Sequence, residues 1–268
     1  MSLTRKLKLK TWFFLQRNRR NPIVARVAKL CKNIHRATEH PSDDCSVNGE
    51  RDIIARFAGS DSAIHFDVGA NRGDWTALAL ELNPKSRLFL FEINPPVAAE
   101  VAARFAANPA VQVFPFGLSD NEATVEVTAF TGDNSALTAI GRTTWSVLPY
   151  TVIQAPVKKG DDVCQAAGVN QIDILKVDAE GAEFQILQGF TRMLQGKKIR
   201  CIQFENYART LRDFHEILRP CGYVIGKLYA NYVDFREYDR SVDEFLGPNY
   251  IAIPETETAL IAELKKGW

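Results

Sequence analysis

An aspartate and two glycines stand where an apolar stretch of the sequence, Ile64 to Val68, gives way to a polar turn. The aspartate is Asp67 and the glycines are Gly69 and Gly73. A glycine-rich turn that leaves a buried strand commonly holds a ligand, because glycine lets the backbone approach that ligand closely. Three ligands are compatible with such a turn: a dinucleotide, a phosphate group and S-adenosylmethionine.

The residue types within the turn separate these three ligands. A dinucleotide turn would read G-x-G-x-x-G, but Asn71 occupies the place of the middle glycine. A phosphate loop would need G-x-x-x-x-G-K-[ST], which the turn lacks. Asp67 suits a cationic ligand, and S-adenosylmethionine carries a sulfonium and an amino group but no phosphate. We therefore expect cofactor contacts from Asp67, Gly69, Ala70, Asn71 and Gly73.

Two later apolar segments also end in residues that suit a nucleoside. The segment FLFEINP contains Glu92, and a carboxylate at the end of a second strand can accept hydrogen bonds from both ribose hydroxyls. NAD and S-adenosylmethionine share this ribose, so Glu92 alone does not choose between them. The segment FGLSD would pass beside the adenine. The cofactor contacts expected from these two segments are Glu92, Ile93, Gly117, Leu118 and Ser119.

A third group of residues could activate an acceptor for methyl transfer. An alcohol holds its proton tightly, so a hydroxyl acceptor needs a positioned base or a metal ion. The segment KVDAEGAE supplies Lys176, Asp178 and Glu180, and a later strand ends in Glu205. We expect these four residues to be catalytic, with Asp178 or Glu180 as the base and Asp178 also beside the cofactor. The alternative for Asp178 is a simple ion pair with Lys176, since the two residues share one face of a strand.

A magnesium ion is the second option at the same strand ends. Asp178, Glu205 and Asn206 resemble, in type and spacing, the magnesium ligands of catechol-type O-methyltransferases. Mg²⁺ prefers carboxylate and amide oxygens, and a bound ion could lower the pKa of an acceptor hydroxyl. Asn206 could instead cap a helix that starts near Ala208, because asparagine is a favoured N-cap.

Alternating strands and helices must position these residues. From residue 50 onward, short apolar runs such as 87–91 alternate with helical patterns such as 74–82 and 182–194. This alternation predicts an α/β fold with a mostly parallel sheet and helices on both faces. The period-two pattern of ATVEVTAF predicts an antiparallel excursion, and the polar stretch after it, which contains Ser135, is expected to cover the substrate.

Together these segments resemble the motifs of the FkbM-type methyltransferases. They are FDVGANRGDW, FLFEINP, GLSD, ILKVDAEGAEFQILQGF and IQFENY, and the resemblance covers about residues 60–255. It implies the use of S-adenosylmethionine and a Rossmann-like class I methyltransferase fold, a seven-stranded sheet with a reversed last strand. It also implies methylation of hydroxyls, including those of sugars in glycans. The segment GDDVC departs from the family, which commonly has Leu-Asp there, and this difference bears on packing.

The first 38 residues differ in charge from the rest of the chain. They contain eleven Lys and Arg but no Asp or Glu, and the remainder holds 22 basic residues against 32 acidic ones. Apolar residues at helical spacing from Ile23 to Ile34 would let this arm lie on an anionic membrane or pack on its own acidic body. We expect residues 1–49 to form a basic helical arm and linker, and residues 50–268 to form the methyltransferase domain.

Composition also bounds the location and the partners. No apolar run approaches the ~18 residues of a transmembrane helix, so we expect a cytoplasmic protein, peripheral at the inner membrane face if the arm binds lipid. Five widely spaced cysteines and four histidines show no zinc-ligand spacing. Nucleic acid is not an expected partner, because the body is acidic. The sequence indicates no oligomeric state.

The leading hypothesis is therefore an S-adenosylmethionine-dependent O-methyltransferase. Its acceptor would be a hydroxyl of a small molecule or glycan, most simply a sugar in glycan or natural-product biosynthesis. One alternative is a methyltransferase with another acceptor, such as an amine or a nucleic-acid ribose. Another is a non-catalytic membrane-associated module, and an NAD dehydrogenase lacks the glycine fingerprint.

Overall fold

The computed structural model describes residues 3–39, 44–57, 59, 62–130, 132–141, 148–206, 211–235 and 249–267. Packing divides the chain into a smaller unit, residues 1–41, and a larger unit, residues 42–268, and each is described by itself. Residues 44–49, which the sequence places in a linker, fall within the larger unit, where Asn48 is buried.

The smaller unit contains the helices α1 (Leu3–Arg17) and α2 (Pro22–Glu39). Asn21 begins α2, since its Oδ1 accepts a hydrogen bond from the N–H of Ile23 at 2.9 Å. Pro22 lacks an N–H and stands at the first helical position, where proline is favoured. Within the part of the chain that the structure describes, no helix is both long enough and apolar enough to cross a bilayer.

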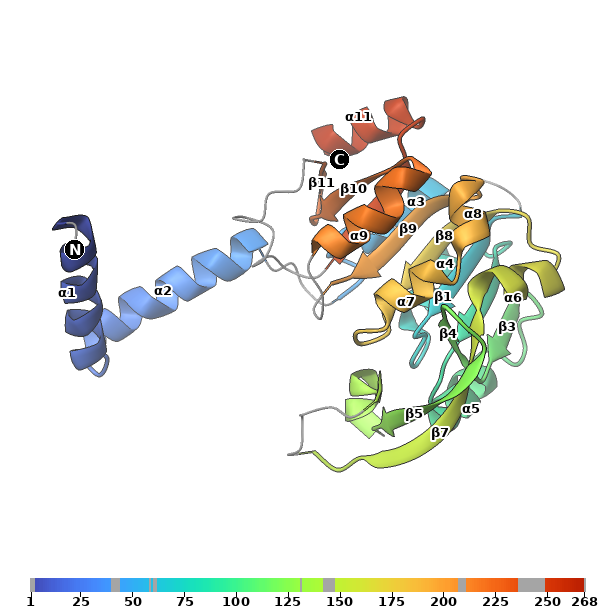
Figure 1. Cartoon of the computed structure of the whole chain (residues 1–268), viewed down its shortest axis with the longest axis horizontal. Helices are drawn as coiled ribbons and strands as arrows, with labels where there is room; N and C mark the ends of the chain where they lie inside the picture. Colours follow the sequence, from blue (N-terminus) through green and yellow to red (C-terminus); the bar gives the residue numbers. More distant parts are fainter. Residues whose placement is uncertain are drawn as a thin grey trace. The chain divides into compact units, whose positions relative to one another are not determined.

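The larger unit is built on a central sheet (Figure 1). Its strands are β1 (Ile64–Val68), β2 (Arg87–Phe91), β3 (Val111–Phe114), β8 (Ile172–Val177), β9 (Ile199–Glu205), β10 (Tyr223–Leu228), β11 (Val233–Asp234) and β12 (Asn249–Pro254). Their order across the sheet is β11-β10-β12-β9-β8-β1-β2-β3. The five strands from β9 to β3 in this order are parallel, and β12 is antiparallel to both of its neighbours. The predicted mostly parallel sheet with a reversed last strand is thus confirmed, although the short edge strand β11 makes eight strands where the sequence predicts seven.

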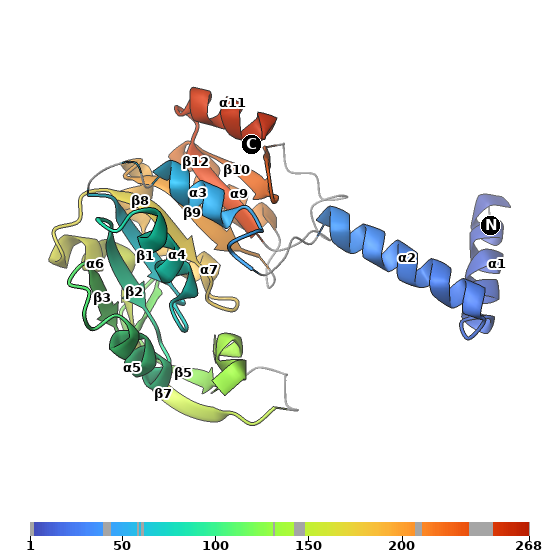
Figure 2. The same cartoon turned by 180° about the vertical axis from the view of Figure 1, so that it is seen from behind.

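Helices cover both faces of this sheet, as the alternation predicts (Figures 1 and 2). They are α3 (Glu50–Phe57), α4 (Asp74–Leu82), α5 (Pro95–Arg104), α6 (Gly160–Ala166), α7 (Glu183–Gln188), α8 (Thr191–Gln195), α9 (Leu211–Leu218) and α11 (Thr258–Lys266). Successive residues of a strand point to opposite faces. In β2, Phe89 therefore belongs to the core layer formed with α6 to α9, and Leu88 to the layer formed with α3, α4, α5 and α11.

A second, smaller sheet follows β3. Its strands are β4 (Gly117–Ser119), β5 (Ala123–Ala129), β6 (Ala139–Ile140) and β7 (Thr151–Lys159), in the order β4-β7-β5-β6. Strand β5 pairs antiparallel with β7, which confirms the predicted antiparallel excursion.

The helix predicted over 182–194 is instead divided into α7 and α8. The two helices meet at Gly189, which lies against β4. A Cβ on Gly189 would lie 2.1 Å from the carbonyl oxygen of Ser119. Glycine at this position therefore lets the smaller sheet approach the end of α7.

Candidate active site

The register of the central sheet brings four predicted site residues into one row. One row of paired residues across the sheet consists of Phe91 of β2, Val68 of β1, Val177 of β8 and Phe204 of β9. The residues that follow them in these four strands are Glu92, Gly69, Asp178 and Glu205. Asn249 of the reversed strand β12 pairs with Glu205. This row lies at the carboxyl edge of the parallel strands, where ligands bind in open α/β sheets.

The glycine turn has positive φ angles, a backbone conformation that residues other than glycine rarely adopt. Gly69 and Gly73 both have φ of 78°, and Asn71 between them has φ of 45°. A Cβ on Gly69 would lie 1.7 Å from the carbonyl oxygen of Asp178, so glycine is required where β1 meets the loop after β8. A Cβ on Gly73 would instead lie 2.6 Å from the ring of Phe105. Gly73 therefore allows α4 to pack closely against the end of α5.

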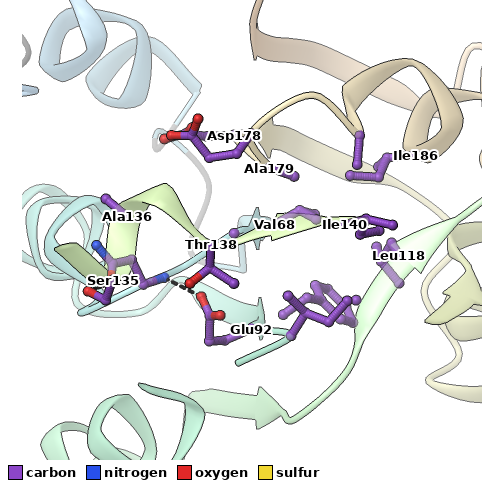
Figure 3. A pocket seen from close by; sticks show the side chains of 17 residues that line it. Val68, Glu92, Leu118, Ser135, Ala136, Thr138, Ile140, Asp178, Ala179 and Ile186 are labelled. Atoms are coloured by element: carbon purple, nitrogen blue, oxygen red, sulfur yellow. Dashed lines mark hydrogen bonds between the residues drawn. The ribbon is translucent and has the colours of Figure 1, made fainter. Parts of the chain in front are cut away.

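A cavity at this edge brings together most of the residues expected to contact the cofactor (Figure 3). Those that line it are Gly69, Asn71, Glu92, Ile93, Gly117, Leu118 and Asp178. Glu92 and Asp178 lie on different sides of the cavity, and Leu118 and Ile186 contribute an apolar wall. The cavity thus combines carboxylates with an apolar surface, which suits a charged nucleoside.

Glu92 is held in place by the backbone. Its side chain is buried, its Oε2 accepts a hydrogen bond from the N–H of Asn71, and its Oε1 accepts one from the N–H of Asn94, both at 2.8 Å. Burial raises the pKa of this carboxyl, and the two N–H donors act against that rise. Because a carboxylate oxygen can accept more than one hydrogen bond, each oxygen can still accept one hydroxyl.

The polar insert after β5 contributes to this same cavity. It forms the 3₁₀ helix η1 (Gly132–Leu137) and then β6. The Ser135 hydroxyl donates a hydrogen bond to Oδ1 of Asn71 at 2.7 Å, and Ser135 and Thr138 both line the cavity. The insert therefore lies beside the expected cofactor residues, whereas the sequence predicts that it covers the substrate.

Four of the expected cofactor residues do not line this cavity: Asp67, Ala70, Gly73 and Ser119. Asp67 is fully buried, and its Oδ2 accepts a hydrogen bond from the Thr76 hydroxyl at 2.7 Å. Its Oδ1 lies 3.4 Å from Nζ of Lys176, the residue paired with it on β8. The charge of Asp67 is therefore balanced inside the protein, beneath the glycine turn.

Lys176 is the cation among these strand-end carboxylates. Its Nζ lies 3.4 Å from Oδ1 of Asp67 and 3.3 Å from Oδ2 of Asp178. Burial alone would lower the pKa of Lys176, but Asp67, Asp178 and further carboxylates outweigh burial and raise it above its ordinary value. The ion pair between Lys176 and Asp178, foreseen as an alternative, is present, and the lysine bridges two aspartates.

A second and more polar cavity adjoins the first. Gly69, Asn71 and Asp178 line both cavities, and among these three only Asp178 has an acidic side chain. The other residues that line the second cavity are Cys45, Asn48, Glu50, Ala70, Arg72, Asp74, Trp75, Lys176, Glu205 and Asn249. Trp75 is buried, and its Nε1 has no hydrogen-bond partner among the described residues. The second cavity thus offers donors and acceptors to a polar ligand beside the first.

Two glutamates of the second cavity hold their protons more tightly than usual. Burial, together with the nearby Asp178, raises the pKa of Glu205 to about 9. Burial also raises the pKa of Glu50, although Lys176 and a hydrogen bond of 2.7 Å from Asn48 oppose that rise. At neutral pH Glu205 therefore carries a proton and can donate a hydrogen bond.

The loop after β8 is organised around Glu183. Its Oε1 accepts hydrogen bonds from the N–H groups of Ala179 and Gly181, both at 3.0 Å. Glu180, between those two residues, has φ of 48° and lines the first cavity. Burial and the charge of Asp178 raise the pKa of Glu180 to about 7. Glu183 thus shapes the loop that presents Asp178 and Glu180.

Among the residues of the second cavity that sequence reasoning missed are Asn48, Glu50 and Asn249. Asn48 and Glu50 precede the glycine turn and lie outside the motif-bearing segments. Asn249 reaches the cavity because β12 inserts between β9 and β10. No local pattern in the sequence indicates these positions, since only the assembled tertiary structure brings them to the edge.

The described residues give no support to a magnesium ion at this edge. Among them, no group of three His, Cys, Asp or Glu is arranged to hold a metal ion. Lys176 already balances the charge of Asp178. Asn206 does not line either cavity, and its buried Oδ1 has no hydrogen-bond partner among the residues that the structure describes. The helix start that Asn206 was expected to cap falls at residues 207–210, outside the described residues.

Replacing Glu205 by glutamine is expected to flatten the pH dependence of the unfolding free energy. An ordinary glutamate loses its proton near pH 4.5, whereas Glu205 in the folded protein keeps it to about 9. The stability that Glu205 contributes is therefore complete below pH 4.5 and is lost as the pH rises to about 9. The wild-type free energy should fall by up to about 1.4 kcal/mol more per pH unit than that of the variant.

Urea unfolding of the wild type and Glu205→Gln at several pH values between about 5 and 9 measures this difference. Glu100→Gln, an exposed position on α5, is the matched control and should keep the wild-type slope. Equal slopes for the wild type and Glu205→Gln would contradict the raised pKa.

The strand order, the glycine turn and the buried carboxylate at the end of β2 define an S-adenosylmethionine-dependent methyltransferase domain of the class I type. The family model of the methyltransferase FkbM domain matches residues 67–225. The chain belongs to this family, which confirms the resemblance of its motifs.

Two relatives of assigned activity align with the chain. One, a 2-O-methyltransferase named NoeI from Sinorhizobium fredii, is 26% identical over 155 residues, 54% of this chain and 63% of that protein. The other, a hexuronic acid methyltransferase named AglP from Haloferax volcanii, is 24% identical over 201 residues, 73% of this chain and 80% of that protein. The chain thus spans less than two thirds of the first relative.

A solved structure, methyltransferase FkbM from Methylobacillus flagellatus, aligns with 72% of this chain and 44% of that chain. The TM-score of this alignment is 0.46, and the two sequences are 17% identical.

Proposed function

We propose that this protein transfers a methyl group from S-adenosylmethionine to a hydroxyl group, and that the hydroxyl belongs to a sugar. The observation that carries the proposal is the position of Asp178, an acidic residue that lines both the first cavity and the polar second cavity. A methyl donor in the first cavity and an acceptor in the second would meet at this carboxylate.

The first cavity fits S-adenosylmethionine on three observations. The backbone at Gly69 leaves room that a Cβ would fill. Glu92 keeps two acceptor directions for ribose hydroxyls. Leu118 and Ile186 supply an apolar surface for a base. When bound, the cofactor would supply a methyl group activated by a positively charged sulfur. The sulfur would be the leaving group and would keep the electron pair of the sulfur–carbon bond.

The chain's own side chains would prepare the acceptor. The carboxylate of Asp178 would accept the proton of the acceptor hydroxyl as the new oxygen–carbon bond forms. Lys176, 3.3 Å from that carboxylate, holds it in position and stabilises its charge before the transfer. Glu205, which is protonated at neutral pH, would donate a hydrogen bond that orients the acceptor.

A sugar acceptor is supported by the polar cavity and by the relatives. The residues that line the second cavity carry side-chain amides and carboxylates, which are groups that bind several hydroxyls at once. The two relatives named above are a 2-O-methyltransferase and a hexuronic acid methyltransferase. For this chain we propose a sugar hydroxyl as the acceptor, without naming the sugar or the position of the hydroxyl.

Methyl transfer to candidate acceptors, followed with methyl-labelled cofactor, tests this proposal. Incubation with free sugars, nucleotide sugars and glycans, each with and without EDTA, is expected to label an oxygen in at least one acceptor with no loss of rate in EDTA. Label on nitrogen would establish an amine acceptor, and label on the ribose of RNA a nucleic-acid acceptor. Calorimetry that detects no binding of S-adenosylmethionine would leave a non-catalytic module as the better description.

A further inference from the structure

The helix α2 carries an exposed apolar stripe. Ile23, Val27, Leu30 and Ile34 are each more than half exposed. At about 100° per residue, these four side chains fall within about 60° of one another around the helix axis. They therefore form one continuous line along α2 that no described residue of the smaller unit covers.

The helix α1 adds a second exposed apolar group. Trp12, Phe13 and Phe14 are each more than half exposed, and Leu7 and Leu15 are also exposed. Aromatic side chains of this kind are typical of helices that lie at the boundary between water and lipid. Five large apolar side chains in water on a helix of 15 residues are far more than the scattered exposed residues of a water-facing surface.

The charge of the same segment has one sign. Residues 1–38 contain eleven Lys and Arg and no acidic residue, and the first carboxylate of the chain is Glu39 at the end of α2. On α2, Arg26, Lys29 and Lys32 are exposed and lie away from the apolar stripe. Basic side chains on one face and apolar side chains on another are the arrangement of a helix that rests on an anionic membrane.

Two other occupants of the stripe fit these observations less well. The spacing of Ile23, Val27, Leu30 and Ile34 would also suit a coiled coil with a second copy of the chain. Two such arms would bring many positive charges together, and Glu39 at the end of α2 would be the one acidic residue of each helix pair available for a salt bridge. A nucleic acid would neutralise the charges but would leave the aliphatic stripe in water.

We infer that residues 3–39 bind the surface of an anionic bilayer, with the apolar stripe of α2 and the aromatic group of α1 in the lipid and the basic side chains against the headgroups. This inference does not depend on the acceptor or on catalysis. It predicts binding that requires both the charges and the apolar side chains of the arm.

Co-sedimentation of the full chain with vesicles measures this binding. Vesicles of phosphatidylcholine with about one third phosphatidylglycerol are expected to bind the protein, and pure phosphatidylcholine vesicles much less. Changing Arg26, Lys29 and Lys32 together to glutamate is expected to weaken binding at least about 100-fold, since each basic residue near an anionic surface contributes about fivefold. Raising the salt to about 1 M should weaken the wild type strongly, because the screening length falls to about 3 Å.

A variant that keeps every charge separates lipid insertion from simple attraction. Changing Ile23, Val27, Leu30 and Ile34 together to serine is expected to weaken binding at least about tenfold, because the buried apolar area is lost. The matched controls lie in the larger unit. They are Val152→Ser, for an exposed apolar residue, and the triple change of Lys198, Lys265 and Lys266 to glutamate, for exposed charges, and both should bind as the wild type does.

Three outcomes would overturn the inference. Unchanged vesicle binding by the serine variant would show that the stripe does not enter lipid, and a lower melting temperature of that variant would then place the stripe on the protein's own body. A dimer that the serine changes dissociate, with no vesicle binding by the wild type, would assign the stripe to a second copy. Binding to RNA but not to anionic vesicles would assign the charges to a nucleic acid.

Discussion

The change Asp178→Asn is expected to lower kcat for methyl transfer by about 10³-fold while the affinity for S-adenosylmethionine changes by less than about tenfold. An asparagine keeps the size of the side chain but cannot accept a proton from the acceptor hydroxyl. Lys176 keeps its other partner, Asp67, at 3.4 Å, so the buried cation is not left alone. The loss should therefore fall on the chemical step and not on the fold.

Initial rates with saturating labelled cofactor measure this effect, and calorimetry measures cofactor affinity separately. Asp162→Asn is the matched control, because Asp162 is an exposed aspartate on α6 that pairs with Arg192 away from both cavities. That control should keep the wild-type rate within about twofold, as most exposed substitutions do. A wild-type rate in Asp178→Asn would remove Asp178 from the role of base and leave Glu180 as the candidate.

Glu92→Gln is expected to weaken binding of S-adenosylmethionine by about 100-fold, a loss of roughly 2.7 kcal/mol. Glutamine has one acceptor oxygen where glutamate has two, and both oxygens of Glu92 are already bonded to backbone N–H groups at 2.8 Å. One of those buried donors would lose its acceptor, and one ribose hydroxyl would lose its partner. The loss combines both effects and falls on the cofactor site.

Calorimetric titration with S-adenosylmethionine is the direct measurement. Glu100→Gln makes the same chemical change on the exposed side of α5 and should leave the affinity unaltered. The melting temperature of Glu92→Gln without cofactor shows whether the fold survives. A folded variant with wild-type affinity would mean that the ligand of the first cavity does not use Glu92.

Much of the fold could be predicted because its signals are local. The apolar run 87–91, the helical pattern 74–82 and the glycine turn between β1 and α4 each specify their own conformation, and the structure contains all three. The alternation of such units implies a parallel sheet with helices on both faces. The split of the predicted helix 182–194 could not be seen, because Gly189 is required by contact with Ser119, which is distant in the sequence.

The sequence by itself determined which residues stand at the ends of the strands, since strand, turn and helix are each read over a few residues. It therefore identified Gly69, Glu92 and Asp178 as candidate site residues, and the tertiary structure then aligned them through strand register. Only the tertiary structure decided what each carboxylate faces. Asp67 and Lys176 are paired across two strands more than a hundred residues apart, so their charges balance in the interior. The second cavity likewise exists only after the sheet is assembled, because its walls come from segments that the chain order separates and the strand order unites.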